Sequence, residues 1–122
     1  MNWRYGVNGI DIVGRTFDFS VRIINLCQVL DEKPGVSRIL AGQVLRSGTS
    51  IGANVEEAQA SQSQADFTSK LSIACKEARE THYWLRLIST TNVIPKSKLS
   101  QLIDESNQLI AILTTIIKKT RK

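Results

Sequence analysis

Hydrophobic residues recur at steps of three and four along most of the chain, which is the period of an amphipathic α-helix. Residues that disfavour helix divide this pattern into four segments, at about 11–32, 36–61, 64–91 and 96–120. Pro34-Gly35 separates the first two, and Pro95 ends the third because the residue before a proline disfavours helix. The pattern predicts an all-α protein of one domain, folded as an antiparallel, up-down four-helix bundle.

The first segment carries two apolar stripes on roughly opposite sides. The first stripe contains Ile10, Val13, Phe17, Val21 and Ile24, and the second contains Ile12, Phe19, Ile23, Leu26 and Leu30. One stripe can be buried inside the bundle. A large exposed apolar stripe is otherwise unfavourable in so small a protein, so the other is expected to contact another subunit. This pattern predicts a homo-oligomer.

The second segment contains two glycines within a helical pattern. Gly48 and Gly52 each cost about 0.8–1 kcal/mol relative to alanine in a helix, yet the apolar spacing continues through them. We therefore expect a helix whose glycines let a neighbouring helix approach closely. A polar row shares this segment and consists of Gln43, Arg46, Ser50, Asn54 and Glu57. The row predicts a hydrogen-bond network between helices or subunits, which we favour over a ligand site.

The third segment carries the best candidate for a binding face. Its members share one side of the helix at helical spacing: Lys76, Arg79, Tyr83 and Arg86. Cations around an aromatic ring suit phosphate contact and base stacking, and Arg46 would add to this face if the two helices are neighbours. Structural ion pairs, such as Lys76 with Glu80, are the alternative. On the adjoining side, Glu77, Glu80 and Trp84 predict an interhelical network with Arg46.

Charge agrees with an anionic partner without requiring one. The 122 residues include 16 Lys and Arg against 11 Asp and Glu, which gives a formal charge of +5. Nucleic-acid-binding surfaces have such a basic excess, but so do many solvated surfaces. Four of the last five residues are basic, namely Lys118, Lys119, Arg121 and Lys122. A solvated tail that complements the dipole of the last helix is the favoured interpretation of this cluster.

The remaining composition predicts a reduced, cytoplasmic protein without a catalytic centre. Cys27 and Cys75 lie within apolar stretches and are expected to be buried thiols. The chain has no apolar run long enough to cross a bilayer and no signal-peptide pattern. His82 is the single histidine, so one chain cannot build a paired-histidine metal site. No Walker or dinucleotide-binding motif occurs. We expect no enzyme activity, no metal and no cofactor.

Two long motifs resemble the signatures of the bacterial four-helix-bundle family known as 23S rRNA-intervening-sequence proteins. The first is residues 43–58, QVLRSGTSIGANVEEA. The second is Asp66-Phe67 followed by residues 70–87, KLSIACKEARETHYWLRL. The resemblance extends over about residues 12–117, nearly the whole chain.

The resemblance implies an assembly and a class of partner. A related branch of the family, the accessory variability determinant of diversity-generating retroelements, forms a basic pentameric barrel that binds a reverse transcriptase and nucleic acid. Similarity to that branch implies a ring-shaped homo-oligomer, a pentamer, with affinity for RNA or DNA. We therefore expect a non-catalytic nucleic-acid-binding oligomer that serves as accessory to a nucleic-acid-processing enzyme. The alternative is a protein–protein interaction scaffold with no intrinsic affinity for nucleic acid.

Overall fold

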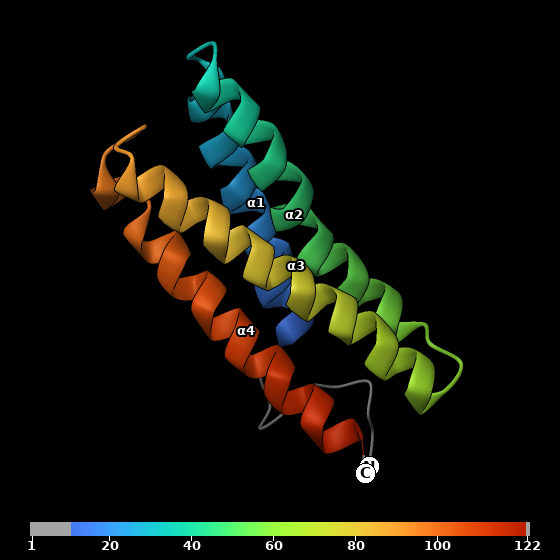
Figure 1. Ribbon diagram of the computed structural model, residues 1–122. Helices are drawn as coiled ribbons and strands as arrows, with labels where there is room; N and C mark the ends of the chain where they lie inside the picture. Colours follow the sequence, from blue (N-terminus) through green and yellow to red (C-terminus); the bar gives the residue numbers. More distant parts are fainter. Residues whose placement is uncertain (1–10, 122) are drawn as a thin grey trace.

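The computed structural model describes residues 11–121, which form four α-helices and one short 3-10 helix and contain no strand. The helices are α1 (Ile12–Asp31), α2 (Val36–Gln59), α3 (Gln64–Thr90), the 3-10 helix η1 (Lys96–Lys98) and α4 (Ser100–Thr120). Figure 1 shows the four α-helices as long rods that lie along one another. The prediction of an all-α bundle of four helices is confirmed.

Side-chain caps fix where two of the helices begin. The Asp11 carboxylate accepts a hydrogen bond from the backbone N–H of Gly14 at 2.8 Å and caps α1. The Ser63 hydroxyl accepts one from the N–H of Asp66 at 3.0 Å and caps α3. The first N–H groups of a helix have no partner inside it, so a side-chain oxygen at this position stabilises the helix start.

The start of the last helix differs from the prediction. The hydrophobic pattern predicted a helix from about residue 96, but α4 begins at Ser100. Residues before it form a tighter turn, in which the N–H of Lys98 donates to Pro95 O and that of Leu99 donates to Lys96 O. These bonds span three residues, as in a 3-10 helix, and no side chain caps α4.

The core contains one stripe of α1 and excludes the other. Phe19, Ile23 and Leu30 are fully buried, together with apolar residues from α2, α3 and α4. Phe17, Val21 and Ile24 of the other stripe are 57%, 44% and 43% exposed. We call these three residues the α1 outer stripe; Val13 is half-buried, and Ile10 lies outside the described residues. The first helix therefore has one face inside its own bundle and one face open.

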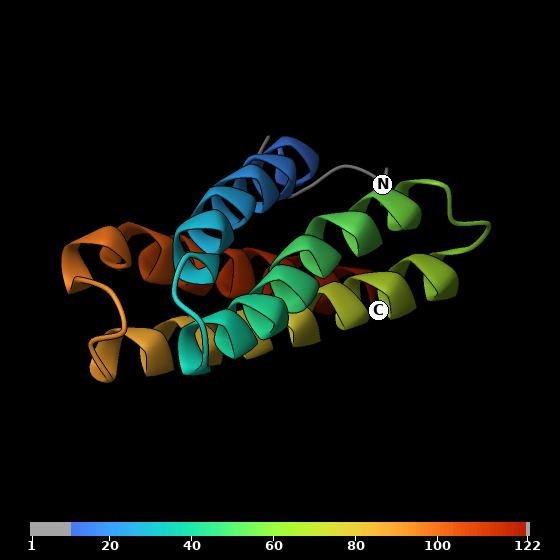
Figure 2. The same cartoon turned by 90° about the horizontal axis from the view of Figure 1, so that it is seen from above.

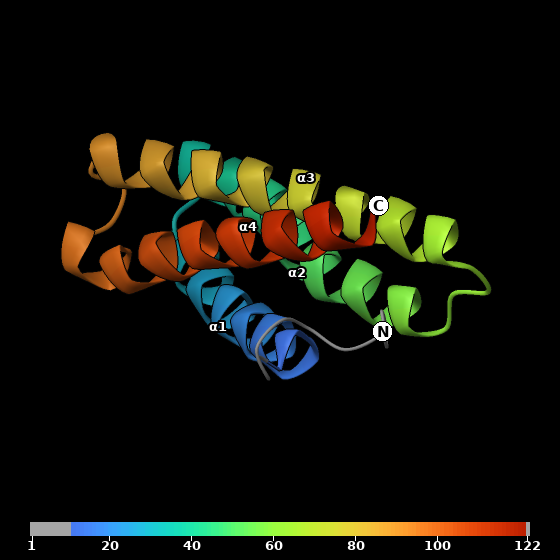
Figure 3. The same cartoon turned by 90° about the horizontal axis from the view of Figure 1, so that it is seen from below.

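The helices are arranged so that each packs on its neighbours in the sequence. α2 lies between α1 and α3, α3 lies between α2 and α4, and α1 contacts α4 much less. Figures 2 and 3 show α1 crossing the rest of the bundle at an angle. A side-chain link joins α1 to α4: Arg15 donates to the Glu105 carboxylate at 2.6 and 3.1 Å and to Gln108 Oε1 at 3.0 Å.

Gly48 and Gly52 lie where α2 faces α1. A Cβ atom at Gly48 would be 2.8 Å from Ile23 Cγ2, and one at Gly52 would be 3.1 Å from the backbone oxygen of Thr16. Both distances are shorter than ordinary van der Waals contacts between carbon atoms or between carbon and oxygen. A larger residue would therefore require the Ile23 side chain, or the α1 backbone at Thr16, to shift.

Both cysteines are free and buried, as the sequence predicted. Burial raises the pKa of Cys27 to about 11, and the nearby negative charge of Asp31 adds to this rise. The thiol therefore stays protonated at neutral pH, which suits a packing role. Of the helices described, none is long and apolar enough to span a membrane.

Candidate nucleic-acid interface

The outer face of α3 presents three cations around an aromatic ring. Lys76, Arg79 and Arg86 are exposed, and Tyr83 between them is 50% exposed. None of the three cations forms an ion pair with another residue of the 11–121 range. We call these four residues the α3 basic strip. The structural ion pair considered for Lys76 with Glu80 does not form, because Glu80 is engaged elsewhere.

Arg46 does not belong to this strip, because its charge is used in ion pairs with two carboxylates. Its guanidinium binds Glu77 at 3.3 Å and also contacts the Glu80 carboxylate. The indole Nε1 of Trp84 donates to the same Glu80 carboxylate at 3.0 Å. Arg46 therefore joins α2 to α3 through two carboxylates, and its charge is already compensated. We leave it out of the candidate interface.

The other members of the polar row make local bonds or none among the described residues. Ser50 Oγ donates to the carbonyl of Arg46 at 2.6 Å, and Asn54 Nδ2 donates to the carbonyl of Ser50 at 2.8 Å. Both bonds lie within α2. Gln43 and Glu57 are exposed. Within residues 11–121, only Arg46 links this row to another helix through a side-chain hydrogen bond.

The structure adds two cations that the binding-face prediction did not include. Lys118 and Arg121 lie beside Lys76 and Arg79, and all four line an open groove of about 270 Å³ between α3 and α4. The other lining residues are Ser72, Cys75, Thr114 and Ile117. We call this groove the α3–α4 seam. In the sequence, Lys118 and Arg121 belong to the basic cluster of the last five residues. That cluster was interpreted as a solvated tail and was not assigned to the binding face.

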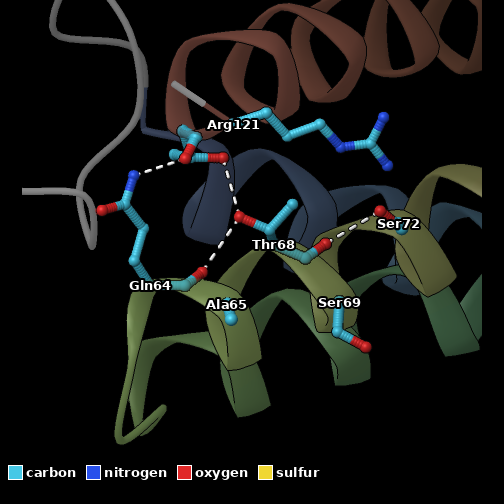
Figure 4. A pocket seen from close by; sticks show the side chains of 7 residues that line it. Gln64, Ala65, Thr68, Ser69, Ser72 and Arg121 are labelled. Carbon is cyan, nitrogen blue, oxygen red and sulfur yellow. Dashed lines mark hydrogen bonds between the residues drawn. The ribbon is translucent and has the colours of Figure 1, made fainter.

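A second hollow continues the seam toward the start of α3. It measures about 610 Å³ and shares Ser72 and Arg121 with the first groove. Thr68 Oγ1 lies 2.9 Å from Thr120 Oγ1, and the Gln64 amide donates to the carbonyl of Thr120. Figure 4 shows the Arg121 side chain extending above Thr68 toward the turn of Ser72. The two hollows are therefore neighbours that share Ser72 and Arg121, and hydroxyl groups line both of them.

His82 contributes no charge to this surface at neutral pH. Its ring is half-buried on α3. Burial lowers the pKa of His82, and the positive charge of Arg86 lowers it further. The imidazole is therefore mainly neutral at pH 7, so the positive potential of the strip comes from Lys and Arg. No group of three or more potential metal-ligating side chains occurs within residues 11–121.

The described residues thus form a small all-α bundle of four helices, with an exposed basic strip on one helix and an exposed apolar stripe on another. A family model places it further: the chain belongs to the 23S rRNA-intervening sequence protein family, whose model matches residues 8–115. A crystal structure of a protein of unknown function from the S23 ribosomal protein family of Bacteroides thetaiotaomicron VPI-5482 is similar in sequence and fold. It is 42% identical, covers 88% of this chain and 98% of its own, and superposes with a TM-score of 0.81. No curated protein matches the chain significantly.

Proposed function

We propose that this protein is a non-catalytic module that binds RNA or DNA through the α3 basic strip. The observation that carries the proposal is a set of three uncompensated cations around an exposed tyrosine on one helix face. Lys and Arg bind phosphates mainly through charge, and an exposed aromatic ring can stack on a base. The family's description, which refers to a sequence that intervenes in 23S rRNA, agrees with a partner of this class. In the cytoplasm such a module would serve as accessory to a nucleic-acid-processing enzyme, such as a reverse transcriptase.

The proposal includes an assembly of several copies. The α1 outer stripe supports it, because three large apolar side chains in a row remain exposed although the core beside them is complete. An antiparallel, up-down bundle leaves that side of α1 free for another copy. A closed ring, with five copies as in the related branch, would repeat the α3 basic strip around its circumference and strengthen binding through multiple contacts.

Fluorescence anisotropy with a short labelled RNA, at low and physiological salt, tests the proposal. The variant K76E/R79E/R86E should lose binding by about two orders of magnitude or more at low salt, because several phosphate contacts are reversed in charge. A matched variant, K33E/K96E/K98E, changes net charge equally at exposed positions outside α3 and should retain most of the affinity. Equal losses in the two variants, or a wild-type protein that binds no RNA or DNA, would refute it.

A protein–protein scaffold is the second candidate function, and the α1 outer stripe also supports it. Apolar residues exposed in a row can contact a different protein instead of a second copy. This function predicts weak nucleic-acid binding that does not respond to charge reversal on α3. The same anisotropy measurement therefore separates the two functions.

A further inference from the structure

We infer that the α3–α4 seam holds the phosphate backbone of a single-stranded nucleic acid, with Lys118 and Arg121 of α4 as binding residues beside Lys76 and Arg79. This inference rests on the proposed function and deepens it. It extends the interface from one helix to two and names the form of nucleic acid that is bound.

The charges that line the seam favour binding of an anion. Four cations line a groove of about 270 Å³, and none of its lining residues is a carboxylate. The five ion pairs among residues 11–121 all lie elsewhere. Cations held close together repel one another, and the negative charge of a bound phosphate chain would offset that repulsion. Binding would also release counterions from the nucleic acid, which favours the complex.

The helix dipole explains only half of this cluster. Lys118 lies in the last turn of α4 and Arg121 follows its end, where cations are favourable in any protein. Lys76 and Arg79 lie in the middle of α3, far from either helix end. No dipole favours cations there, so their position opposite Lys118 and Arg121 requires a separate reason. A shared ligand provides one.

The shape of the seam suits a chain rather than a single phosphate ion. The second hollow, of about 610 Å³, continues the groove past Ser72 and Arg121 to Gln64 at the start of α3. Arg121 extends along this path in Figure 4. Ser69 also lines the hollow, and its exposed hydroxyl makes no hydrogen bond to another described residue. A polymer with one charge per repeat can extend over two neighbouring hollows, whereas a lone ion would occupy one of them.

The aromatic ring beside the seam favours a single strand. Tyr83 lies four residues beyond Arg79 on the same helix, which corresponds to about 6 Å along its axis. Its ring is half exposed. Stacking on a protein ring requires an unpaired base, since the faces of bases in a duplex are covered by their neighbours. A strand with phosphates in the seam can place such a base on Tyr83.

The test reverses the two α4 cations and leaves α3 intact. K118E/R121E is compared with K96E/K98E, which makes the same change in net charge at exposed positions in η1. The probes are labelled oligouridylate, oligothymidylate of the same length, a duplex, and polyglutamate. K118E/R121E should weaken binding of both single strands at least about tenfold and reduce the salt slope by about 1.4, for two lost phosphate contacts at about 0.7 each. K96E/K98E should remain within about threefold of wild type.

Each other outcome contradicts a defined part of the inference. If K118E/R121E matches K96E/K98E while K76E/R79E/R86E abolishes binding, the seam is refuted and the α3 basic strip stands. If the wild type binds neither single strand nor the duplex, the proposed function fails as well. Tighter binding of the duplex refutes the single-strand form, and equal binding of polyglutamate indicates an acidic protein segment instead. Circular dichroism checks the fold, and K118Q/R121Q replaces the reversal if α4 unravels.

Discussion

At the scale of single residues, the close contact between α1 and α2 depends on two glycines of α2, because a side chain at either position would meet α1. Gly48 leaves room for Ile23, which is completely buried and would lie 2.8 Å from a Cβ atom at Gly48. Gly52 faces the backbone of α1 at Thr16, which cannot shift without moving the whole helix. Each glycine lowers the intrinsic helix propensity of α2 by about 0.8–1 kcal/mol, and close packing with α1 offsets this cost.

Replacing glycines should therefore have effects of opposite sign along one helix. We expect Gly48→Ala to destabilise the protein by about 1 kcal/mol, since overpacking costs about 1–3 kcal/mol and alanine's better propensity recovers part of it. Gly42 of α2 is exposed, and a Cβ atom there would meet nothing within 4 Å, so Gly42→Ala should stabilise by about 0.5–1 kcal/mol. Urea unfolding of both variants measures the contrast. Equal stabilities would contradict the close approach of α1.

At the scale of helices, the side of the bundle between α1 and α4 depends on few interactions. α1 packs mainly on α2, and Arg15 reaches across to α4. The hydrogen bonds from Arg15 to the Glu105 carboxylate raise the pKa of that arginine. The side chains of Arg15 and Glu105 are 32% and 18% exposed, so solvent screens this pair only in part.

Glu105→Ala should consequently cost more than the loss of an exposed ion pair. We expect about 1–2 kcal/mol, because two hydrogen bonds to a charged group are lost and Arg15 keeps only Gln108. The comparison is Asp31→Ala, which removes the pair with Arg38, whose side chains are more than half exposed. That loss should stay below about 0.5 kcal/mol. Thermal unfolding of the two variants measures both losses of stability. Equal losses would show that Arg15 does not hold α1 to α4.

The helices themselves were predictable because hydrophobic spacing and caps act locally. The periods at Phe19 and Ile23 and the cap at Ser63 reside in short stretches of chain. The turn before Ser100 was missed, because the apolar period of α4 continues back through Leu99 without a capping side chain to end it. Element boundaries depend on such caps more than on the period.

The candidate site was predictable only where its members share one helix. Lys76 and Arg79 could be placed on one face from their spacing alone. The polar residues on α2 and α3 predicted the partners of Arg46. They did not show that these ion pairs would leave Arg46 out of the phosphate-binding face. Lys118 and Arg121 are about 40 residues away from Lys76 in the sequence, and their meeting depends on how α3 and α4 pack. A periodicity within one helix contains no information on that register.

At the scale of the whole molecule, the four helices bury one hydrophobic core and still leave apolar side chains exposed on the surface. Phe19 and Ile23 are buried on one side of α1, while the α1 outer stripe is open on the other. Exposed apolar area of this kind is uncommon in a small monomer unless it binds something. The stripe lies on α1, whereas the seam lies between α3 and α4. An assembly in which α1 contacts a surface of the next copy other than the seam would leave the seams of all copies free to bind one strand.

This separation predicts that assembly can be removed without unfolding the chain. Phe17→Glu with Ile24→Glu places charge on the α1 outer stripe, where both side chains are already exposed, so the bundle core is unchanged. Light scattering after size-exclusion chromatography should show the wild type as an oligomer and this variant as a monomer with undiminished helix content. Val36 and Ile39 of α2 are also exposed, at 66% and 68%, and lie outside the stripe, so V36E/I39E is the matched control and should still assemble. The monomeric variant should also bind RNA more weakly, because linked copies bind one strand with a higher effective concentration. A monomeric wild type, or an oligomer that survives both substitutions in the stripe, would show that the exposed face of α1 serves another partner.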